Sequence, residues 1–391
     1  MPILSEALAT TLLDCAVSVV THVPGYGATE TFAAWNRIAP TPSPISFHEE
    51  PAFTIAHGAA VCGARSATLL KSHGLAKAAN SAVDALFAGT VAGFVSVIFD
   101  DATGAHSDCI FDVDALLRGI GIPFQRCNPG SATQALRAAF ATSERLQLPV
   151  AIILDAADVH QEVPAPISVA NPQPHRHLRW ARSIAHHLVS PLFASHQRDR
   201  LQAKLRGESL EAIAETITPP AIPTTPDDLP ETWRRAALPL VPFFQEFRTI
   251  RGQVVAGDTG LTSLFAFPPF DCVDITTYMG GSVPLAIGAM LAGRSGVWGG
   301  TGDFSFIAAG HLGLIEATTR QLPLKLFILD NGAAVVTGGQ PIGPGMLDCV
   351  LAGYADSVRR IVLPAERDQI RAVLEEAAAA TEMRIVVVEC R

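Results

Sequence analysis

The cysteines of this 391-residue chain follow no pattern of a metal site or a disulfide framework. They are seven, an odd number, and no two of them form a C-x-x-C pair. Such spacing argues against the common zinc sites and iron–sulfur clusters. It is typical of a reduced compartment, so we expect a cytoplasmic protein. The cysteines are Cys15, Cys62, Cys109, Cys127, Cys272, Cys349 and Cys390.

Clusters of basic residues and long apolar runs are also missing. The formal net charge is −9, which argues against a broad surface for binding nucleic acid. We therefore expect no nucleic-acid partner. The sequence contains no run of about eighteen uncharged apolar residues, so it predicts no membrane span. The N-terminus lacks a basic region and carries Glu6 and Asp14. It therefore predicts a buried amphipathic helix, not a signal peptide, and we expect no membrane partner.

What the sequence does contain is apolar residues in an alternating α/β arrangement. Hydrophobic residues make up 49% of the chain, enough for sizeable cores, and the length suggests two or three domains. Short β-rich runs alternate with alanine-rich helical runs up to residue 163, and the same pattern returns from residue 240 to the end. This pattern predicts two α/β blocks, 1–163 and 240–391, each with a doubly wound parallel sheet.

Between the blocks, residues 164–239 have a different character. Prolines gather at both ends of this segment, and histidines and arginines lie between them. We interpret it as a linker with one or two helices in its middle.

The strands expected in the first block are 17–23, 45–48, 67–72, 94–100 and 149–155. Those expected in the second block are 252–257, 273–278, 296–300, 324–330, 360–363 and 384–390.

Two neighbouring strands of the second block end in polar residues. One ends in Gly302-Asp303 and the next along the chain ends in Asp330-Asn331. Consecutive strands of a βαβ unit lie close together, so Asp303 and Asn331 should meet at the carboxyl edge of the sheet. A carboxylate and an amide oxygen suit Mg²⁺, which completes its shell with water and phosphate oxygens. The alternative is that both residues simply cap the helices that follow them.

The spacing of these residues resembles a known family. Gly-Asp, followed about thirty residues later by Asn, is similar to the metal–diphosphate motif of thiamine diphosphate enzymes. The stretches VDITTYMGGSVPLAIG and LDNGAAVVTGGQP resemble the α subunit of indolepyruvate ferredoxin oxidoreductases. The resemblance covers both blocks and excludes the linker. It implies a pyrimidine-binding domain at 1–163 and a diphosphate-binding domain at 240–391. Phe304 departs from the pattern, because the commonest version has glycine there.

The resemblance also implies roles for residues of the second block. Asp303, the Asn331 side chain and the Ala333 carbonyl would bind Mg²⁺. Met279 would be an apolar wedge that keeps thiamine diphosphate bent, although without the family it is more readily interpreted as ordinary core. The full set of expected cofactor-binding residues is Asp258, Thr277, Met279, Gly280, Gly302, Asp303, Phe304, Asn331 and Ala333.

In the first block the resemblance points to a glutamate. Glu49 follows the expected strand 45–48 and begins an apolar helix, where the family places the carboxylate that contacts N1′ of the cofactor's pyrimidine. Its neighbour Glu50 is interpreted as compensating the helix dipole. Without the family, both would be interpreted as residues that begin a helix.

Further residues of the first block are candidates for the substrate side of the site. The resemblance makes Tyr26, Gly27 and Thr29 candidate substrate contacts, and Lys71 a partner for a substrate carboxylate. His73 and His106 fall at or just beyond strand ends, where a proton donor would stand. For each histidine the alternative is an ordinary loop residue with its hydrogen bonds satisfied.

The same stretch partly matches a dinucleotide-binding fingerprint. Gly25-x-Gly27-x-x-Glu30 follows a strand, and Glu49 stands about twenty residues later. Glu30 replaces the third glycine, however, and its charge would repel a pyrophosphate at the start of the helix. We therefore favour thiamine diphosphate over a nicotinamide cofactor.

The resemblance has limits that bear on the reaction. The family's α subunit normally continues into a cysteine-rich ferredoxin-like domain, whereas this sequence stops at Arg391, and Gly339 stands where the family has a histidine. We expect a non-oxidative decarboxylase or carboligase that acts on a 2-oxo acid with thiamine diphosphate and Mg²⁺. The alternatives are the catalytic subunit of a 2-oxo acid oxidoreductase that needs a partner subunit, and a binding protein that has lost catalysis.

The resemblance further implies self-association. In thiamine enzymes the two domains usually face each other across a subunit interface. We therefore expect a homodimer or homotetramer in which Glu49 of one chain serves Asp303 of another.

Overall fold

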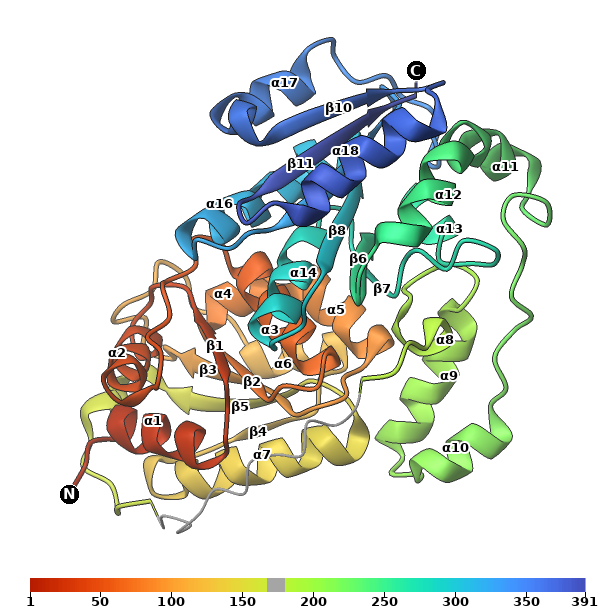
Figure 1. The fold of residues 1–391 in the computed structure, drawn as a ribbon. Coiled ribbons are helices and arrows are strands. Elements are labelled where there is room, and N and C mark those ends of the chain that lie inside the picture. Colours follow the sequence, from red (N-terminus) through yellow and green to blue (C-terminus); the bar gives the residue numbers. More distant parts are fainter. Residues whose placement is uncertain (167–179, 391) are drawn as a thin grey trace. The chain divides into compact units, whose positions relative to one another are not determined.

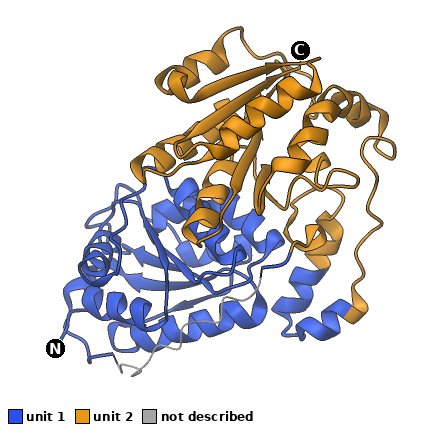
Figure 2. Ribbon diagram, viewed as in Figure 1, with its two compact units in different colours: residues 1–181, 200–214 blue, residues 182–199, 215–391 orange. Residues whose placement is uncertain are grey.

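The computed structural model describes residues 1–166 and 180–390. The chain divides into two compact units (Figure 2). Unit 1 consists of Met1–Ala181 and Arg200–Ala214, and unit 2 of Arg182–Asp199 and Glu215–Arg391. The segment interpreted as a linker is thus shared between the two units.

Unit 1 is built on a five-stranded parallel sheet with the order β1-β2-β3-β5-β4 (Figure 1). Its three central strands are buried almost throughout on both faces, as expected of a parallel sheet with helices on both sides. The strands are β1 (Val19–His22), β2 (Ser66–Lys71), β3 (Phe94–Asp100), β4 (Phe124–Arg126) and β5 (Val150–Asp155).

The helices of unit 1 cover the sheet in two groups, each with its own hydrophobic cluster. Helices α1 (Leu4–Asp14), α2 (Ala28–Ile38) and α7 (Ala132–Leu146) pack in the cluster that contains Leu69, Val97 and Ile152. Helices α3 (Glu49–Val61), α5 (Ala79–Ala88) and α6 (Val113–Ile120) pack in the cluster that contains Leu70, Ile98 and Ile153. Successive strand residues therefore point to opposite clusters, which confirms the predicted doubly wound arrangement. Residues 1–166 also contain the helices α4 (Ser72–Lys77), η1 (Pro129–Ser131) and η2 (Ala156–His160).

One predicted strand of unit 1 is wrong and one strand was missed. Residues 45–48 are not part of the sheet; among the described residues, Ser46 donates one backbone hydrogen bond, of 2.8 Å, to the carbonyl of His22. The prolines at 42 and 44 carry no N–H, so the chain that leads into this segment cannot form a continuous ladder. The missed strand is β4, which has only three residues and pairs with β5 at the edge of the sheet.

Unit 2 is built on a six-stranded parallel sheet with the order β10-β11-β9-β8-β6-β7. All six predicted strands of the second block are present. They are β6 (Val254–Asp258), β7 (Ile275–Thr277), β8 (Val297–Gly302), β9 (Lys325–Asp330), β10 (Val358–Val362) and β11 (Arg384–Glu389). Strands β8 and β9 are direct neighbours, with Gly302 opposite Leu329, as the βαβ argument predicted.

The main hydrophobic cluster of unit 2 lies between the sheet and helices α12 (Val241–Ile250) and α18 (Arg367–Ala379). Phe243, Phe244 and Phe247 of α12 are fully buried there, and each contributes about 1.5–3 kcal/mol by leaving water. The remaining helices of this part are α13 (Leu261–Leu264), α14 (Ser282–Leu291), α15 (Asp303–Ser305), the π-helix η4 (Phe306–Gly310), α16 (His311–Thr319), α17 (Met346–Leu351) and η5 (Ala352–Ser357).

The segment 164–239 is more helical than the one or two helices predicted. Its described residues contain α8 (Ile184–His187), α9 (Ala194–Leu205), α10 (Leu210–Thr216) and α11 (Glu231–Ala237), with η3 (Leu238–Leu240) at its end. Residues 167–179 of the predicted linker lie outside the described part of the chain.

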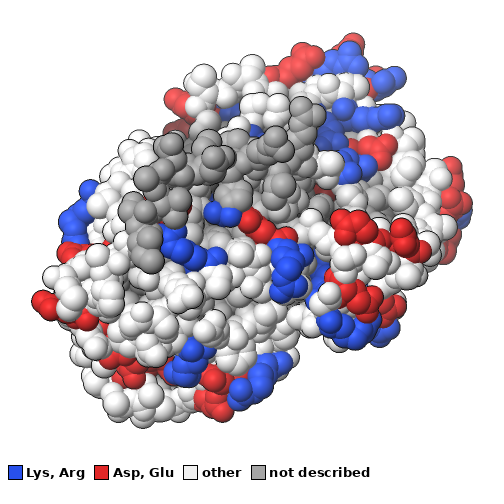
Figure 3. All heavy atoms as spheres, turned by 90° about the horizontal axis from the view of Figure 1, so that it is seen from below, with Lys and Arg blue, Asp and Glu red and all other residues white. Residues whose placement is uncertain are grey.

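The charges on one face and the lengths of the helices bear on the basic clusters and long apolar runs that the sequence lacks. Acidic and basic side chains are interspersed on the face drawn in Figure 3. Within residues 1–166 and 180–390, every helix is too short or too polar to cross a membrane.

Candidate functional site

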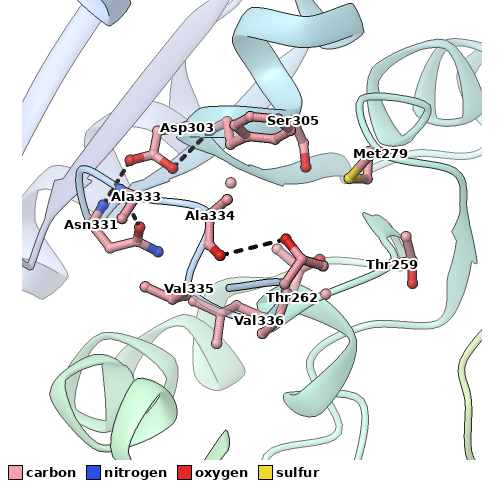
Figure 4. Close-up of a pocket in the computed structure, with 15 residues that line it drawn as sticks. Thr259, Thr262, Met279, Asp303, Ser305, Asn331, Ala333, Ala334, Val335 and Val336 are labelled. Carbon is pink, nitrogen blue, oxygen red and sulfur yellow. Dashed lines mark hydrogen bonds between the residues drawn. The ribbon is translucent and has the colours of Figure 1, made fainter. Parts of the chain in front are cut away.

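Asp303 and Asn331 meet at the carboxyl edge of the unit 2 sheet, where β8 and β9 end (Figure 4). Asp303 is 2% exposed, and its Oδ2 accepts hydrogen bonds from the N–H groups of Asn331, at 3.0 Å, and Gly332, at 2.7 Å. Its Oδ1 accepts a third bond, of 2.7 Å, from the N–H of Phe304. The carboxylate therefore joins its own strand end to the loop that follows the neighbouring strand.

Asn331 orders that loop from the other side. Its Oδ1 accepts a hydrogen bond of 3.1 Å from the N–H of Ala333, which also forms an antiparallel bridge with Pro341. Neither residue is a helix N-cap: the N-cap of α15 is Gly302, and the next helix after Asn331 begins at Met346. Capping therefore does not explain the pair.

The surroundings of Asp303 disfavour a lone negative charge. Burial raises the pKa of Asp303 to about 6, the amide donors of Phe304 and Gly332 oppose this rise, and the nearby charge of Asp330 adds to it. A divalent cation at this carboxylate would offset both the burial and the neighbouring acid.

A small cavity of about 50 Å³ opens in front of these residues (Figure 4). A Cβ added at Gly302 would meet no atom within 4 Å, so the backbone there faces open space. The cavity is lined by Thr259, Gly260, Leu261, Thr262, Met279, Gly302, Asp303, Phe304, Ser305, Asn331, Ala333, Ala334, Val335, Val336 and Thr337. Six of the nine expected cofactor-binding residues are thus brought together at one cavity.

The donor set fits Mg²⁺ with a diphosphate. Asp303 supplies a carboxylate, Asn331 an amide oxygen and Ala333 a carbonyl, all hard oxygen donors of the kind that Mg²⁺ takes. Over the described ranges, no group of three or more His, Cys, Asp or Glu side chains could hold a metal ion. A cation at this edge would take water or phosphate oxygens to complete its shell, and the open backbone at Gly302 leaves room for them.

Met279 lies at the boundary of two cavities. Its side chain lines the cavity of Asp303 and also a second, more apolar one of about 140 Å³. At 43% exposure it is not ordinary core. Pro191 and Trp233, from the segment interpreted as a linker, contribute to the second cavity. No role was predicted for these two residues, because the resemblance excludes the linker.

Asp258, Thr277 and Gly280 do not line either cavity. Asp258 is 1% exposed, and its carboxylate bonds to the protein itself. Thr277 is buried, and its hydroxyl has no hydrogen-bond partner among the described residues. Gly280 has a φ of 87°, and a Cβ there would lie 2.5 Å from the backbone nitrogen of Gly310. The predicted cofactor contacts of these three residues therefore stay predictions.

In unit 1, Glu49 is the first residue of α3. Its side chain is 13% exposed and forms an ion pair of 2.7 Å with Lys77 of α4. Gly74 makes room for it, since a Cβ at that position would lie 3.0 Å from the Cγ of Glu49. Glu50 has a different partner, Asn80, which donates a bond of 2.9 Å. The two neighbouring glutamates thus differ in their partners.

Several predicted substrate-side residues of unit 1 do come together. The rings of Tyr26 and His106 lie 3.9 Å apart between centroids. Lys71 donates a hydrogen bond to the His106 carbonyl, and its side chain passes so close to Gly25 that a Cβ there would lie 2.7 Å from the Lys71 Cγ. Thr29 accepts a bond of 3.0 Å from the Gly25 N–H. His106 is exposed, at the tip of this cluster.

Other predicted residues of unit 1 have structural partners. His73 of α4 contacts the ring of Phe111 edge-on at 5.1 Å. Gly27, with φ 84°, packs against Phe99, and its N–H donates a bond of 2.7 Å to the Glu30 carboxylate. That carboxylate occupies the helix N-terminus where a pyrophosphate would have to bind. The partial dinucleotide fingerprint therefore has a local structural explanation.

Asp101 is a residue of this region that the sequence analysis missed. Its carboxylate accepts bonds from the N–H groups of Ala105, at 3.0 Å, and His106, at 2.7 Å, and these bonds lower its pKa against the effect of burial. It thereby fixes the loop that carries His106. Its position directly after the expected strand 94–100 is the feature that could have identified it.

Comparison with known proteins assigns a class to unit 2. Residues 258–390 match the model of the C-terminal TPP binding domain of thiamine pyrophosphate enzymes. This range contains every residue predicted to bind the cofactor or the metal, and the match confirms the resemblance to thiamine diphosphate enzymes.

Individual relatives agree with that class. The chain is 37% identical over 106 residues to the indolepyruvate oxidoreductase subunit IorA of Archaeoglobus fulgidus, which covers 27% of this chain and 17% of that protein. It is 37% identical over 89 residues to the IorA subunit of Methanothermobacter marburgensis, which covers 23% of this chain and 14% of that protein. The matches therefore span less than a fifth of each relative.

Solved structures extend the likeness of fold to the whole chain. The structures of a putative thiamin diphosphate-dependent enzyme from Mycobacterium smegmatis and of the 4-hydroxybenzoylformate decarboxylase of Rhodococcus jostii RHA1 each superpose with a TM-score of 0.65. Each is 14% identical and covers 100% of this chain and 99% of its own. At this identity the likeness is one of fold, and it confirms the predicted pair of parallel-sheet α/β domains.

Proposed function

We propose that this protein is a thiamine diphosphate- and Mg²⁺-dependent enzyme that removes CO₂ from a 2-oxo acid without oxidising it. The product is then an aldehyde, or a longer 2-hydroxy ketone if a second carbonyl compound is joined. The observation that carries the proposal is the meeting of Asp303 and Asn331 at one cavity, within a segment that matches a TPP binding domain.

Unit 2 would bind the cofactor's diphosphate and the metal. Asp303, Asn331 and the carbonyl of Ala333 would hold Mg²⁺, and the open backbone at Gly302 would lie beside the phosphates. Met279 would present an apolar surface to the cofactor's rings. Thiamine diphosphate, when bound, supplies the electron sink that stabilises the carbanion left by loss of CO₂.

Unit 1 would handle protons and the substrate's carboxylate. Glu49, largely screened from water, would hold a proton at N1′ of the pyrimidine. The ammonium group of Lys71 would bind the carboxylate of the 2-oxo acid, next to Tyr26 and Thr29. His106, which is exposed at the tip of this cluster, and His73 are the candidate donors of the proton that replaces CO₂.

A second candidate function is the catalytic subunit of a 2-oxo acid oxidoreductase. It is favoured by the 37% identity to the IorA subunits, which are named for indolepyruvate oxidoreductases. The non-oxidative reaction is favoured by the structural neighbour that aligns over the whole chain and is named a decarboxylase.

For either function we propose a homodimer or homotetramer, which light scattering at assay concentration would test.

Purified protein with only thiamine diphosphate and Mg²⁺ is expected to release CO₂ from its 2-oxo acid substrate. The measurement is CO₂ release and product analysis over a panel of 2-oxo acids with small, branched, aromatic and acidic side chains. Viologen dye should stay oxidised, and coenzyme A should not be required. Turnover that appears only with coenzyme A, an electron acceptor and a second subunit would instead establish the oxidoreductase.

A further inference from the structure

Asp258 ends strand β6 as a buried carboxylate whose oxygens are all engaged by the protein. Its Oδ2 accepts a hydrogen bond of 2.9 Å from the N–H of Gly280, and its Oδ1 accepts one of 2.8 Å from the N–H of Ser282. The hydroxyl of Thr301 donates a third bond to Oδ2. A carboxylate satisfied in this way is not available to a ligand, which agrees with its absence from the lining of both cavities.

The three donors come from two segments that matter to the site. Gly280 lies in the turn between β7 and α14, which also carries Met279, and Ser282 is the first residue of α14. Thr301 lies in β8, two residues before Asp303. One carboxylate therefore joins the turn that carries the exposed methionine to the strand that carries the candidate metal ligand.

The turn is fixed from its other side as well. Gly280 has a φ of 87°, and a Cβ there would lie 2.5 Å from the nitrogen of Gly310 and 2.7 Å from the carbonyl oxygen of Ser305. Gly310 ends the π-helix η4 and Ser305 ends α15, directly before it; π-helical turns of this kind are common at functional sites. The turn can thus move toward neither Asp258 nor the π-helix.

We infer that Asp258 is a positioning residue, which holds Met279 at the boundary between the two cavities and ties its position to the end of β8. This role of Asp258 deepens the proposed function. It rests on that function only in one respect, that the cavity of Asp303 is the cofactor site. The hydrogen bonds themselves make the placement of Met279 testable in the protein without cofactor.

The test uses the small number of methionines in the chain. The five methionines, labelled with ¹³C at the methyl group, give a sparse NMR spectrum, and Met279→Leu identifies the resonance of Met279. In Asp258→Asn an amide NH₂ must face at least one of the three donors. We expect the Met279 resonance to shift or broaden in the cofactor-free protein, while that of Met383 stays unchanged. The Kd for thiamine diphosphate should rise about 10- to 100-fold, the equivalent of one lost charge-assisted hydrogen bond.

Glu246→Gln is the matched control. Glu246 is a fully buried carboxylate of the same unit, but it bonds to Arg367 and Arg371 of α18. Its replacement should lower the melting temperature and leave the Met279 resonance where it is in the wild type. A Met279 shift of equal size in Glu246→Gln would show that the effect is general loosening, and it would overturn the inference.

A second variant keeps the inference testable if Asp258→Asn does not fold. Thr301→Val removes one donor at nearly constant shape, and it should also shift the Met279 resonance. A folded Asp258→Asn or Thr301→Val protein with a wild-type Met279 resonance would overturn the inference. Failure of the wild type to bind thiamine diphosphate would refute the proposed function, and the cofactor-free spectra would still decide the role of Asp258.

Discussion

Asp303→Ala is expected to abolish the Mg²⁺-dependent binding of thiamine diphosphate. Among the described residues that line this cavity, Asp303 alone carries a carboxylate, and the other expected protein ligands, Asn331 and the Ala333 carbonyl, are neutral. Removing the single anionic ligand from a site with few protein ligands should leave no measurable affinity at millimolar Mg²⁺. Isothermal titration calorimetry with thiamine diphosphate, with and without Mg²⁺, measures this directly.

Loss of the fold must be separated from loss of the ligand in this variant. Alanine leaves the N–H groups of Phe304, Asn331 and Gly332 without their acceptor, so some destabilisation is expected. The melting temperature without cofactor reports that effect by itself. Asp356→Ala, which changes an exposed aspartate of the same unit, is the matched control and should bind as the wild type does. Unchanged affinity in folded Asp303→Ala would refute the metal assignment.

The meeting of Asp303 with Asn331 could be predicted because it depends on local rules. Short β-rich runs mark β8 and β9, and consecutive parallel strands joined by a helical connection usually lie side by side. This prediction required no knowledge of side-chain geometry. The same rules failed for residues 45–48, where alternating apolar and polar residues after Pro44 resemble a strand but the segment does not join the sheet.

Other features of the site could not be read from the chain alone. Asp258 matches a family motif and was expected to bind the cofactor, but its role depends on which donors reach its two oxygens. Trp233 comes from a segment with no recognisable pattern, and only the fold brings it to a cavity with Met279. Residues set by strand periodicity are predictable, whereas those set by long-range packing are not.

Glu49→Gln is expected to slow catalysis about 10²- to 10⁴-fold, the usual cost of losing a positioned acid–base group. Glutamine keeps the size of the side chain but cannot hold an exchangeable proton at N1′ of the pyrimidine. The residues expected to bind the diphosphate and the metal lie in unit 2, so the affinity for thiamine diphosphate should change little. The fold should also persist, because Lys77, the ion-pair partner of Glu49, is half exposed and such pairs contribute about 0–1 kcal/mol.

The decisive measurement for Glu49 is the rate at which the C2 proton of bound thiamine diphosphate exchanges with solvent, followed by NMR after acid quench. This rate reports activation of the cofactor without any substrate, so it does not depend on knowing the 2-oxo acid. Glu50→Gln is the matched control: it changes the next residue of the same helical turn, which bonds to Asn80, and should exchange at the wild-type rate. A slow rate in Glu49→Gln together with a normal rate in Glu50→Gln would assign the proton to Glu49. Equal rates in the two variants and the wild type would show that another group activates the cofactor, and Glu49 would then be a residue that begins α3 and pairs with Lys77.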